Sequence, residues 1–135
     1  MERFPVDDTD RELIEAAIEV LQRNWRPGRH TKGAAVRGPS GKIYRGINVE
    51  GCAYGPCAEV VALGCALSSG EETVRTVVAV RKRGDRFPVV PPCGTCRQLF
   101  VDYASGAFVI LADDRGFFKV RVADLLPETY RTTLD

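Results

Sequence analysis

The sequence shows no strong charge bias and contains a single histidine, a single methionine and a single tryptophan. Its 19 basic and 18 acidic side chains leave a net charge of +1, which argues against a nucleic-acid partner because binding to a polyanion relies on clustered positive charge. No apolar run approaches the roughly 20 residues that a membrane-spanning helix needs. The first residues, MERFPVDDTDRE, lack the apolar core of a secretory signal. These absences predict a cytoplasmic protein with no membrane partner.

Cysteine is present in an odd number, at positions 52, 57, 65, 93 and 96. In a reducing compartment these thiols are not expected to pair as disulfides, and a Cys-x-x-Cys spacing is more typical of metal or redox chemistry. The chain also lacks internal repeats, low-complexity tracts and any stretch that resembles a linker. Its 135 residues, 44% of them hydrophobic, have the size and composition of one ordinary domain. We therefore expect a single domain that spans residues 1–135.

Hydrophobic periodicity predicts alternating helices and strands. Thr9 and Glu12 have the spacing of a capping box and open a one-sided helix that ends at the NWRPGR turn. Strands at 32–38 and 42–49 flank Pro-Ser-Gly and form a hairpin. The later elements, in the order helix, strand, helix, strand, strand and short helix, are expected at 57–69, 73–82, 93–105, 107–112, 117–122 and 123–130, with a loop at 84–92. This order predicts an α/β fold in which helices cover a sheet of five strands.

The predicted helix at 57–69, CAEVVALGCALSS, is apolar nearly all round. Such a helix is usually packed on most of its surface, so we expect Cys65 in the core. Glu59 stands in the first turn, where a buried carboxylate without a partner would be unfavourable. The residue is either a simple favourable charge at a helix N-terminus or part of a chemical site.

Three cysteines stand at the starts of two predicted helices. Cys57 begins one helix, and Cys93 and Cys96 begin the other with a spacing that places both thiols on one side of the first turn. A helix N-terminus favours thiolates through its dipole and its unpaired N–H groups. If the two helix starts adjoin, three thiolates converge, and three protein ligands plus an open position are the pattern of a catalytic zinc ion. Glu59 would then serve as the base for a bound water.

The residues alone leave two alternatives open. Cys52 could approach as a fourth thiolate, which would close the site into a structural zinc domain with a binding role. The three cysteines could also be ordinary buried apolar side chains.

The combined pattern Cys-x-Glu followed by Pro-Cys-x-x-Cys is the signature of zinc deaminases. GPCAEVVALG and PPCGTCRQLF, together with RGINVEG and the closing ADLLPETY, resemble the cytidine deaminase family and, within it, the blasticidin S deaminase branch. The resemblance covers about residues 28–130. It implies a three-layer α/β/α sandwich with a five-stranded mixed sheet, one zinc ion per subunit, and a homotetramer with its sites near the subunit interfaces.

The resemblance also implies the activity and the residues that carry it. The implied reaction is hydrolytic loss of ammonia from the 4-amino group of a cytosine nucleoside, cytidine or deoxycytidine, or of a cytosine-nucleoside antibiotic such as blasticidin S. The implied zinc ligands are Cys57, Cys93 and Cys96, with Glu59 as the acid–base group. The implied substrate contacts are Asn48 and Glu50 on the sugar, His30 on the face of the base, and the backbone of Ala58 on the pyrimidine.

Two features before the first implied zinc ligand favour different substrates: the loop length favours blasticidin S, and the residue types favour cytidine. Cys57 follows Glu50 by seven positions, a shorter spacing than is usual in cytidine deaminases and closer to that of the blasticidin S branch. The triplet Asn-Val-Glu at 48–50, however, has the same residue types as in cytidine deaminases. A nucleotide or nucleic-acid base deaminase is disfavoured, because such relatives usually carry histidine at the position of Cys57 and a basic track for the strand.

The sequence also differs from many family members in a residue that would balance the charge of the zinc site. Three thiolates and one zinc ion carry a net charge of −1, which makes the metal a poorer Lewis acid. Many family members have an arginine directly after the catalytic glutamate, but Val60 stands there in this chain. We therefore predict that Arg97, which follows Cys96, lies beside the ligands and offsets this charge.

Overall fold

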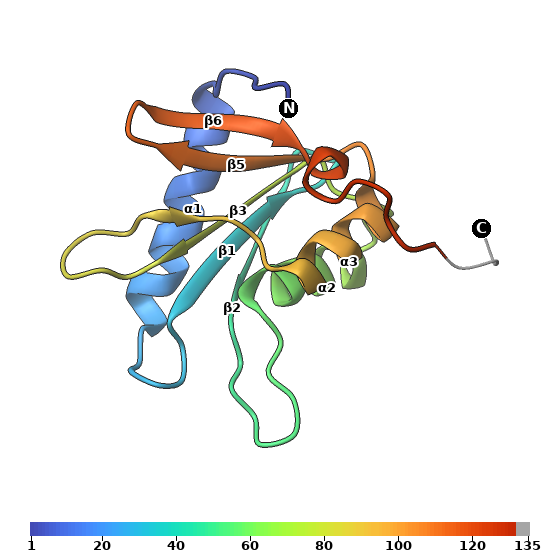
Figure 1. Ribbon diagram of the computed structural model, residues 1–135. Helices are drawn as coiled ribbons and strands as arrows, with labels where there is room; N and C mark the ends of the chain where they lie inside the picture. Colours follow the sequence, from blue (N-terminus) through green and yellow to red (C-terminus); the bar gives the residue numbers. More distant parts are fainter. Residues whose placement is uncertain (132–135) are drawn as a thin grey trace.

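A computed structural model describes residues 1–131 of the protein. Its elements, in chain order, are α1 (Asp8–Asn24), β1 (Lys32–Arg37), β2 (Ile43–Ile47), α2 (Ala58–Ser68), β3 (Thr76–Arg81), β4 (Val89–Val90), α3 (Gly94–Ala104), β5 (Phe108–Asp113), β6 (Gly116–Arg121) and the 3₁₀ turn η1 (Val122–Leu125). Helix α1 covers one face of the sheet, and α2 and α3 cover the other (Figure 1). The predicted three-layer α/β/α fold is confirmed.

The sheet has six strands, one more than predicted. Its order is β2-β1-β3-β5-β6, with β3 and β5 parallel and the other neighbours antiparallel. The sixth strand, β4, lies in the segment predicted as a loop and pairs with the end of β3 at Ala79 and Val80. The strand is only two residues long because prolines stand on both sides of it, and proline cannot donate to a strand ladder.

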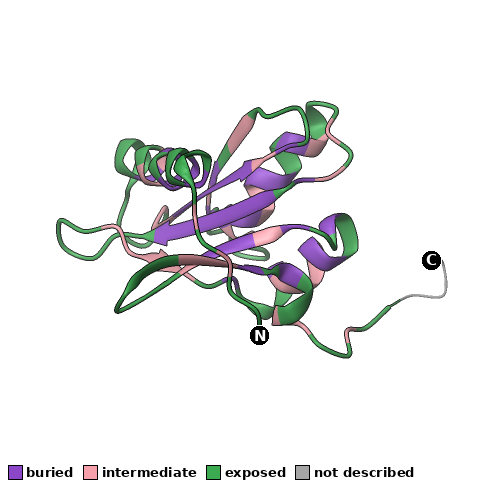
Figure 2. Cartoon of the chain, turned by 90° about the horizontal axis from the view of Figure 1, so that it is seen from above, coloured by how far each residue is buried: buried purple, intermediate pink, exposed green. Residues whose placement is uncertain are grey.

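Alternation along the strands divides the core between the two helical layers. On β3, Val78 and Val80 pack with α1, whereas Val77 and Ala79 pack with α2 and α3. Figure 2 shows the buried residues on the strands and on the helix faces turned toward them. Because both faces are covered, the central strands β1 and β3 are apolar between their ends, at residues 33–36 and 77–80.

Two glycines allow the helices to lie close to the sheet. A Cβ atom at Gly33 would lie 2.5 Å from the carbonyl oxygen of Ala17 in α1. A Cβ atom at Gly46 would lie 2.7 Å from the carbonyl oxygen of Ala58 and 2.5 Å from the backbone nitrogen of Ala62, both in α2. Backbone atoms cannot move aside as a flexible side chain can, so Gly46 determines how closely the start of α2 approaches β2.

The N-terminus of α1 differs from the prediction. The capping box consists of Asp7 and Asp10 rather than Thr9 and Glu12: Asp7 Oδ1 accepts from the Asp10 backbone N–H at 2.9 Å, and Asp10 Oδ2 accepts from the Asp7 N–H at 3.0 Å. Thr9 instead donates its hydroxyl proton to Asp7 at 2.7 Å. Aspartate is at least as good an N-cap as threonine, so the helix begins two residues earlier.

Two predictions about the other helices were wrong. Cys65 is exposed rather than buried, because α2 packs through Ala58, Glu59, Ala62, Leu63 and Ala66 and leaves the face with Cys65 uncovered. The predicted helix at 123–130 is only the short turn η1, since Pro127 disfavours helical conformation at the residue before it. None of the helices described by the structure has the length and apolar character required to cross a bilayer.

Candidate metal centre and active site

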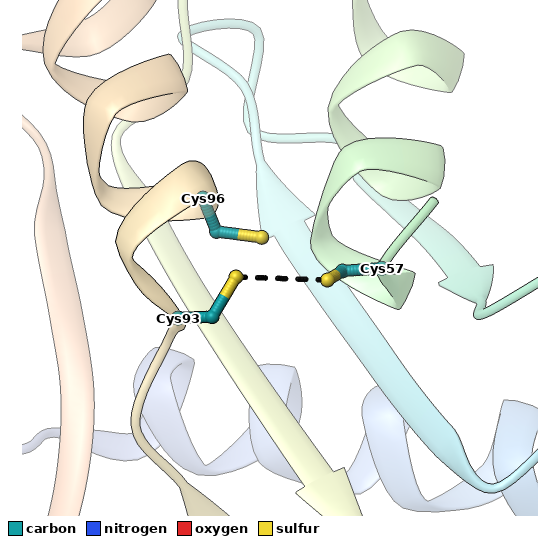
Figure 3. Close-up of side chains that lie close together, drawn as sticks. All are labelled: Cys57, Cys93 and Cys96. Carbon is teal, nitrogen blue, oxygen red and sulfur yellow. Dashed lines mark hydrogen bonds between the residues drawn. The ribbon is translucent and has the colours of Figure 1, made fainter. Parts of the chain in front are cut away.

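Three sulfur atoms converge where α2 and α3 begin. Cys57 and Cys93 are the N-caps of the two helices, and Cys96 lies in the first turn of α3. The three Sγ atoms all lie within 4.8 Å of one another, and those of Cys57 and Cys93 are 3.7 Å apart (Figure 3). A tetrahedral zinc ion with Zn–S bonds of about 2.3 Å requires sulfurs roughly 3.8 Å apart. The donor set therefore fits zinc, as the sequence predicted.

Local chain geometry turns these sulfurs toward one another. Pro56 and Pro92 precede the two N-cap cysteines, and the backbone at Cys57 and Cys93 is extended. The Cys57 thiol makes no capping hydrogen bond to its own helix, and the Sγ atoms of the two N-cap cysteines lie close enough together to share an ion. The unpaired N–H groups of each first turn lie beside the sulfurs and favour negative charge there.

The pKa values of the thiols move in different directions. Burial raises the pKa of Cys57 and of Cys96. Burial acts in the same direction on Cys93, but hydrogen bonds from the backbone N–H of Cys96 and from the neighbouring thiols outweigh it and lower the pKa of Cys93. A cation among the three sulfurs would favour the thiolate form of all of them.

A hollow of about 220 Å³ opens beside the sulfurs of Cys57 and Cys93. Its wall comes from β1, the 48–57 loop, α2, β3, β4 and the segment before α3. The sequence did not indicate that Lys32, Val90 and Pro91 line this site. The available signal was chain proximity, because Val90 and Pro91 stand only three and two positions before Cys93.

Glu59 lines the same hollow and is only 6% exposed. Burial raises the pKa of its carboxyl group, although its own backbone N–H and the charge of Lys32 act in the opposite direction. A buried carboxyl group whose pKa lies above the usual range is suited both to accepting and to returning a proton. This is the property that an acid–base group beside a metal centre needs.

Asn48 and Glu50 also line the hollow, and Asn48 is 5% exposed. The Asn48 side-chain oxygen accepts from the backbone N–H groups of Thr31 at 2.8 Å and Lys32 at 3.0 Å. Its Nδ2 donates to Glu50 Oε1 at 2.9 Å and to the Arg29 carbonyl oxygen at 3.2 Å. Every hydrogen-bonding position of this amide is thus used within the protein, and one of these bonds holds the Glu50 carboxylate.

Within the described chain, His30, Ala58 and Arg97 are not among the residues that line the hollow. His30 Nδ1 lies 2.9 Å from the Asn48 carbonyl oxygen. Ala58 is fully buried at the start of α2. Arg97 donates from Nε to the Pro92 carbonyl oxygen at 2.8 Å and from Nη1 to the Leu125 carbonyl oxygen at 3.2 Å.

Cys52 does not complete a four-cysteine site. It is exposed, and the described residues that could hold a metal together are only Cys57, Cys93 and Cys96. Three sulfur ligands leave a fourth tetrahedral position for water or substrate, which is the arrangement of a catalytic rather than a structural zinc site.

Comparison with known proteins agrees with this geometry. The family model of the cytidine and deoxycytidylate deaminase zinc-binding region matches residues 7–112. The chain is 36% identical to blasticidin-S deaminase of Bacillus cereus, over 96% of this chain and 98% of that protein. It is also 36% identical to cytidine deaminase of Halalkalibacterium halodurans, over 87% of this chain and 91% of that one.

Solved structures show the same fold. Cytidine deaminase of Burkholderia pseudomallei superposes with a TM-score of 0.73 at 29% identity and covers 89% of this chain and 98% of its own. Cytidine deaminase of Mycobacterium tuberculosis gives a TM-score of 0.75 at 26% identity, with 93% and 100% coverage.

The fold and the three-sulfur site are those of a zinc-dependent deaminase, a hydrolase that acts on carbon–nitrogen bonds. The chain belongs to the cytidine and deoxycytidylate deaminase family. The family resemblance found in the sequence is therefore confirmed, and zinc is the cofactor for which the three cysteines form the site.

Proposed function

We propose that the protein catalyses the hydrolytic deamination of free cytosine nucleosides or of a cytosine-nucleoside antibiotic such as blasticidin S. Water replaces the 4-amino group with oxygen, and ammonia is released. The observation that supports this most strongly is the position of Glu59, a buried carboxyl group in the hollow that Cys57 and Cys93 also line.

When bound, the zinc ion supplies a Lewis acid that lowers the pKa of a water at its open position. Glu59 would accept a proton from the attacking water and would deliver protons to the ring N3 and to the departing amine, so one carboxyl group would serve every proton transfer. Its burial excludes bulk water, which would otherwise compete for these protons.

Glu50 is our proposed contact for the sugar. Its carboxylate lines the hollow and is held there by Asn48 Nδ2 at 2.9 Å. Because the Asn48 amide already makes four hydrogen bonds, we assign it a positioning role in place of the direct sugar contact expected from the sequence. The contacts of His30 with the base and of the Ala58 backbone with the pyrimidine remain predictions.

Arg97 is our proposed cation beside the zinc ligands. Its guanidinium donates a hydrogen bond from Nε to the carbonyl oxygen of Pro92, the residue directly before Cys93. Replacement of Arg97 by alanine should lower the deamination rate or the zinc content, because a positive charge and a backbone tether are both lost. An Arg97→Ala variant with unchanged zinc content and rate would contradict this role, and Arg115→Ala on the exposed β5–β6 turn is a matched control.

The proposed activity is tested by ammonia release from cytidine, deoxycytidine, cytosine and blasticidin S. We expect release from at least one nucleoside by protein that carries one zinc ion per chain. A Cys57→Ser variant should lose both zinc and activity. Zinc-loaded protein that is inactive on all four compounds would refute the proposal.

We also propose a cytoplasmic homotetramer built from single-domain chains, with sites close to subunit contacts. The apolar helix α2 leaves one face uncovered, including Cys65, and Tyr54 in the loop before α2 is 70% exposed. Five free thiols are compatible with a reducing compartment. Light scattering on the purified protein tests the assembly, and a monomer at assay concentration would refute it.

A further inference from the structure

A second hollow, of about 1170 Å³, lies between the β3–β4 connection and the β5–β6 turn. It is lined by residues 83–84, 86–89 and 112–117, and we call it the hairpin groove. Its two walls project from the same side of the molecule (Figure 1), and the described residues that line it all differ from those that line the hollow beside the three sulfurs. Its volume exceeds the roughly 300–1,000 Å³ of small-molecule sites, so the groove has room for a polypeptide segment.

The floor of the hairpin groove is an apolar part of the sheet that α1 does not cover. Phe87 and Val89 pack on the α1 side of the sheet. Ala112 lies two residues after Ile110 of the same cluster, and Phe117 pairs with Ala112, so both lie on this side as well. No described residue of α1 lines the groove, and Phe117 is 40% exposed. An aromatic ring on the floor is therefore open to a partner.

The backbone of β4 presents an open edge to the groove. The Arg81 N–H donates to the Pro88 carbonyl oxygen at 3.1 Å, and Val80 pairs with Val89 at the next position of the ladder. Bonded and non-bonded pairs alternate along antiparallel strands. The N–H and C=O groups of Val89 therefore point away from β3.

The facing edge of β5 is open as well. Strand β5 pairs with the start of β3 and β4 with its end, both on the edge that β1 leaves free. The N–H and C=O groups of Lys119 bond to Phe4 rather than to β5, so by the same alternation those of Ala112 point away from β6. No backbone hydrogen bond between described residues joins β4 to β5. Val89 and Ala112 thus form two unpaired strand edges in one groove.

The rim of the groove carries more unpaired positive than negative charge. Three arginines line it, none of them part of an ion pair within the described chain: Arg83, Arg86 and Arg115. Of the two lining carboxylates, Asp113 already accepts from Arg3 at 2.7 Å, which leaves Asp114. Asp85 lies in the β3–β4 connection but is not among the described residues that line the groove. The excess of cations favours a partner that carries carboxylates.

Two simpler explanations account for only part of this arrangement. Charged side chains beside open strand edges prevent aggregation between sheets. That role explains the arginines but not the exposed ring of Phe117 on the floor. A symmetric contact with a second copy of the chain would bring the same arginines together, and like charges oppose such a contact.

We propose that the hairpin groove binds an extended acidic segment of a partner protein. Main-chain groups of the segment bond to the open edges at Val89 and Ala112, as in the addition of a strand to a sheet. Its apolar side chains contact Phe87 and Phe117, and its carboxylates pair with the rim arginines. This binding is additional to the deaminase function and does not depend on it.

The test uses the zinc-loaded protein and a fluorescent peptide of alternating glutamate and valine, about six residues long, which is a usual strand length. A peptide of alternating lysine and valine and an N-methylated form of the acidic peptide are the controls. We expect the acidic peptide to bind, less tightly as salt is raised, and the lysine peptide not to bind. The N-methylated form should bind more weakly, because it lacks main-chain donors.

Variants of the groove test the side-chain contacts. Arg86→Met and Arg115→Met should each weaken binding of the acidic peptide about two- to fivefold, the effect of one exposed ion pair. Phe117→Ala should also weaken it, because an apolar contact is lost. Arg86→Lys should bind nearly as the wild type does, and Arg45→Met, altered at an exposed position of β2, should bind equally well. Zinc content and melting temperature show that each variant is folded.

Several outcomes would overturn the inference. They are equal binding of the acidic and lysine peptides, equal binding of the N-methylated form, and wild-type binding by both Arg86→Met and Arg115→Met. If the wild type binds no peptide and Phe117→Ala changes the assembly seen by light scattering, the groove belongs to a contact between copies, which also overturns it. Ammonia release is measured separately, so a failure of the deaminase function leaves this result unaffected.

Discussion

At the residue scale, burial and hydrogen bonds give ordinary side chains the properties that the site needs. Glu59 is buried at a helix start, and burial raises the pKa of its carboxyl group. The Asn48 side-chain amide makes four hydrogen bonds, all to neighbouring groups of the protein. Neither effect depends on an unusual residue type. Both arise because the fold removes water from the side chain and supplies particular partners.

Replacing Glu59 by glutamine should remove activity while leaving the metal in place. The amide has the same shape but cannot carry protons, so we expect kcat to fall by about 10²- to 10⁴-fold. Zinc content should be unchanged, and thermal stability unchanged or raised, because a buried charge is lost. Metal analysis, ammonia release and thermal melting measure these quantities, with exposed Glu72→Gln as the control. A near wild-type rate would point instead to a metal site without a catalytic role.

Asp7 makes the stability of the protein depend on acid pH. Its pKa is lowered to about 2, chiefly by hydrogen bonds from the Thr9 hydroxyl and the Asp10 N–H. An unfolded aspartate titrates near about pH 3.9, so the stabilisation is complete above that value and is lost as pH falls toward about 2.

Asp7→Asn keeps a capping acceptor but does not titrate. We therefore expect wild-type protein to lose more stability than Asp7→Asn when pH is lowered from about 5 to about 2. Urea unfolding midpoints at the two pH values provide the measurement. Parallel losses in the two proteins would show that the Asp7 carboxylate is not responsible.

At the element scale, the site depends on how closely two helix starts approach the sheet. Helix α2 lies so close to β2 that Gly46 has no room for a Cβ atom beside Ala58 and Ala62. Ala58 directly follows the zinc ligand Cys57, so the packing of α2 also places a sulfur.

Gly46→Ala should therefore weaken both the fold and the metal centre. We expect a loss of about 1–3 kcal/mol in unfolding free energy, since the added methyl group meets backbone atoms. Zinc affinity should fall with it, because α2 must shift. Gly64→Ala, in the same helix with open space around it, should be neutral or stabilising by up to about 1 kcal/mol. Equal effects of the two changes on stability and zinc binding would contradict this account.

Element boundaries show how far local patterns can be trusted. The long periodic helix and the apolar strands were predicted because hydrophobic spacing is a local property. Strand β4 was not predicted because two residues between prolines are too few to show a periodic pattern. The segment is recognised as a strand because it pairs with β3. The burial of Cys65 was mispredicted because an apolar helix does not reveal which of its faces meets the sheet.

At the scale of the whole molecule, zinc connects segments that are distant in the chain. Cys57 is the N-cap of α2, Cys93 is the N-cap of α3 and Cys96 lies in the first turn of α3, with β3 and β4 between them in the sequence. A ligand that binds the folded state alone stabilises that state in proportion to its affinity and free concentration. The metal is therefore expected to support the fold as well as the reaction.

Removing zinc should lower the melting temperature. A chelator should shift the transition of the wild type downward, and the same chelator saturated with zinc beforehand should not. Cys93→Ser should melt near the apo temperature with or without chelator, because one ligand is missing. Identical melting of the zinc-loaded and zinc-free wild type would show that the metal does not stabilise the fold.

The sequence by itself determined the family, the layered fold and the candidate metal ligands, because hydrophobic periodicity and the Cys-x-Glu and Pro-Cys-x-x-Cys motifs are local patterns. Only the tertiary structure decided that the starts of α2 and α3 meet and that Glu59 lines the hollow beside them. The tertiary structure also decided that Lys32 and Val90 line the hollow, that Asn48 holds Glu50, and that Cys52 stays apart from the metal site. Those relations depend on strand register and on helix-to-sheet distance. Both are properties of contacts between remote segments, which no local pattern records.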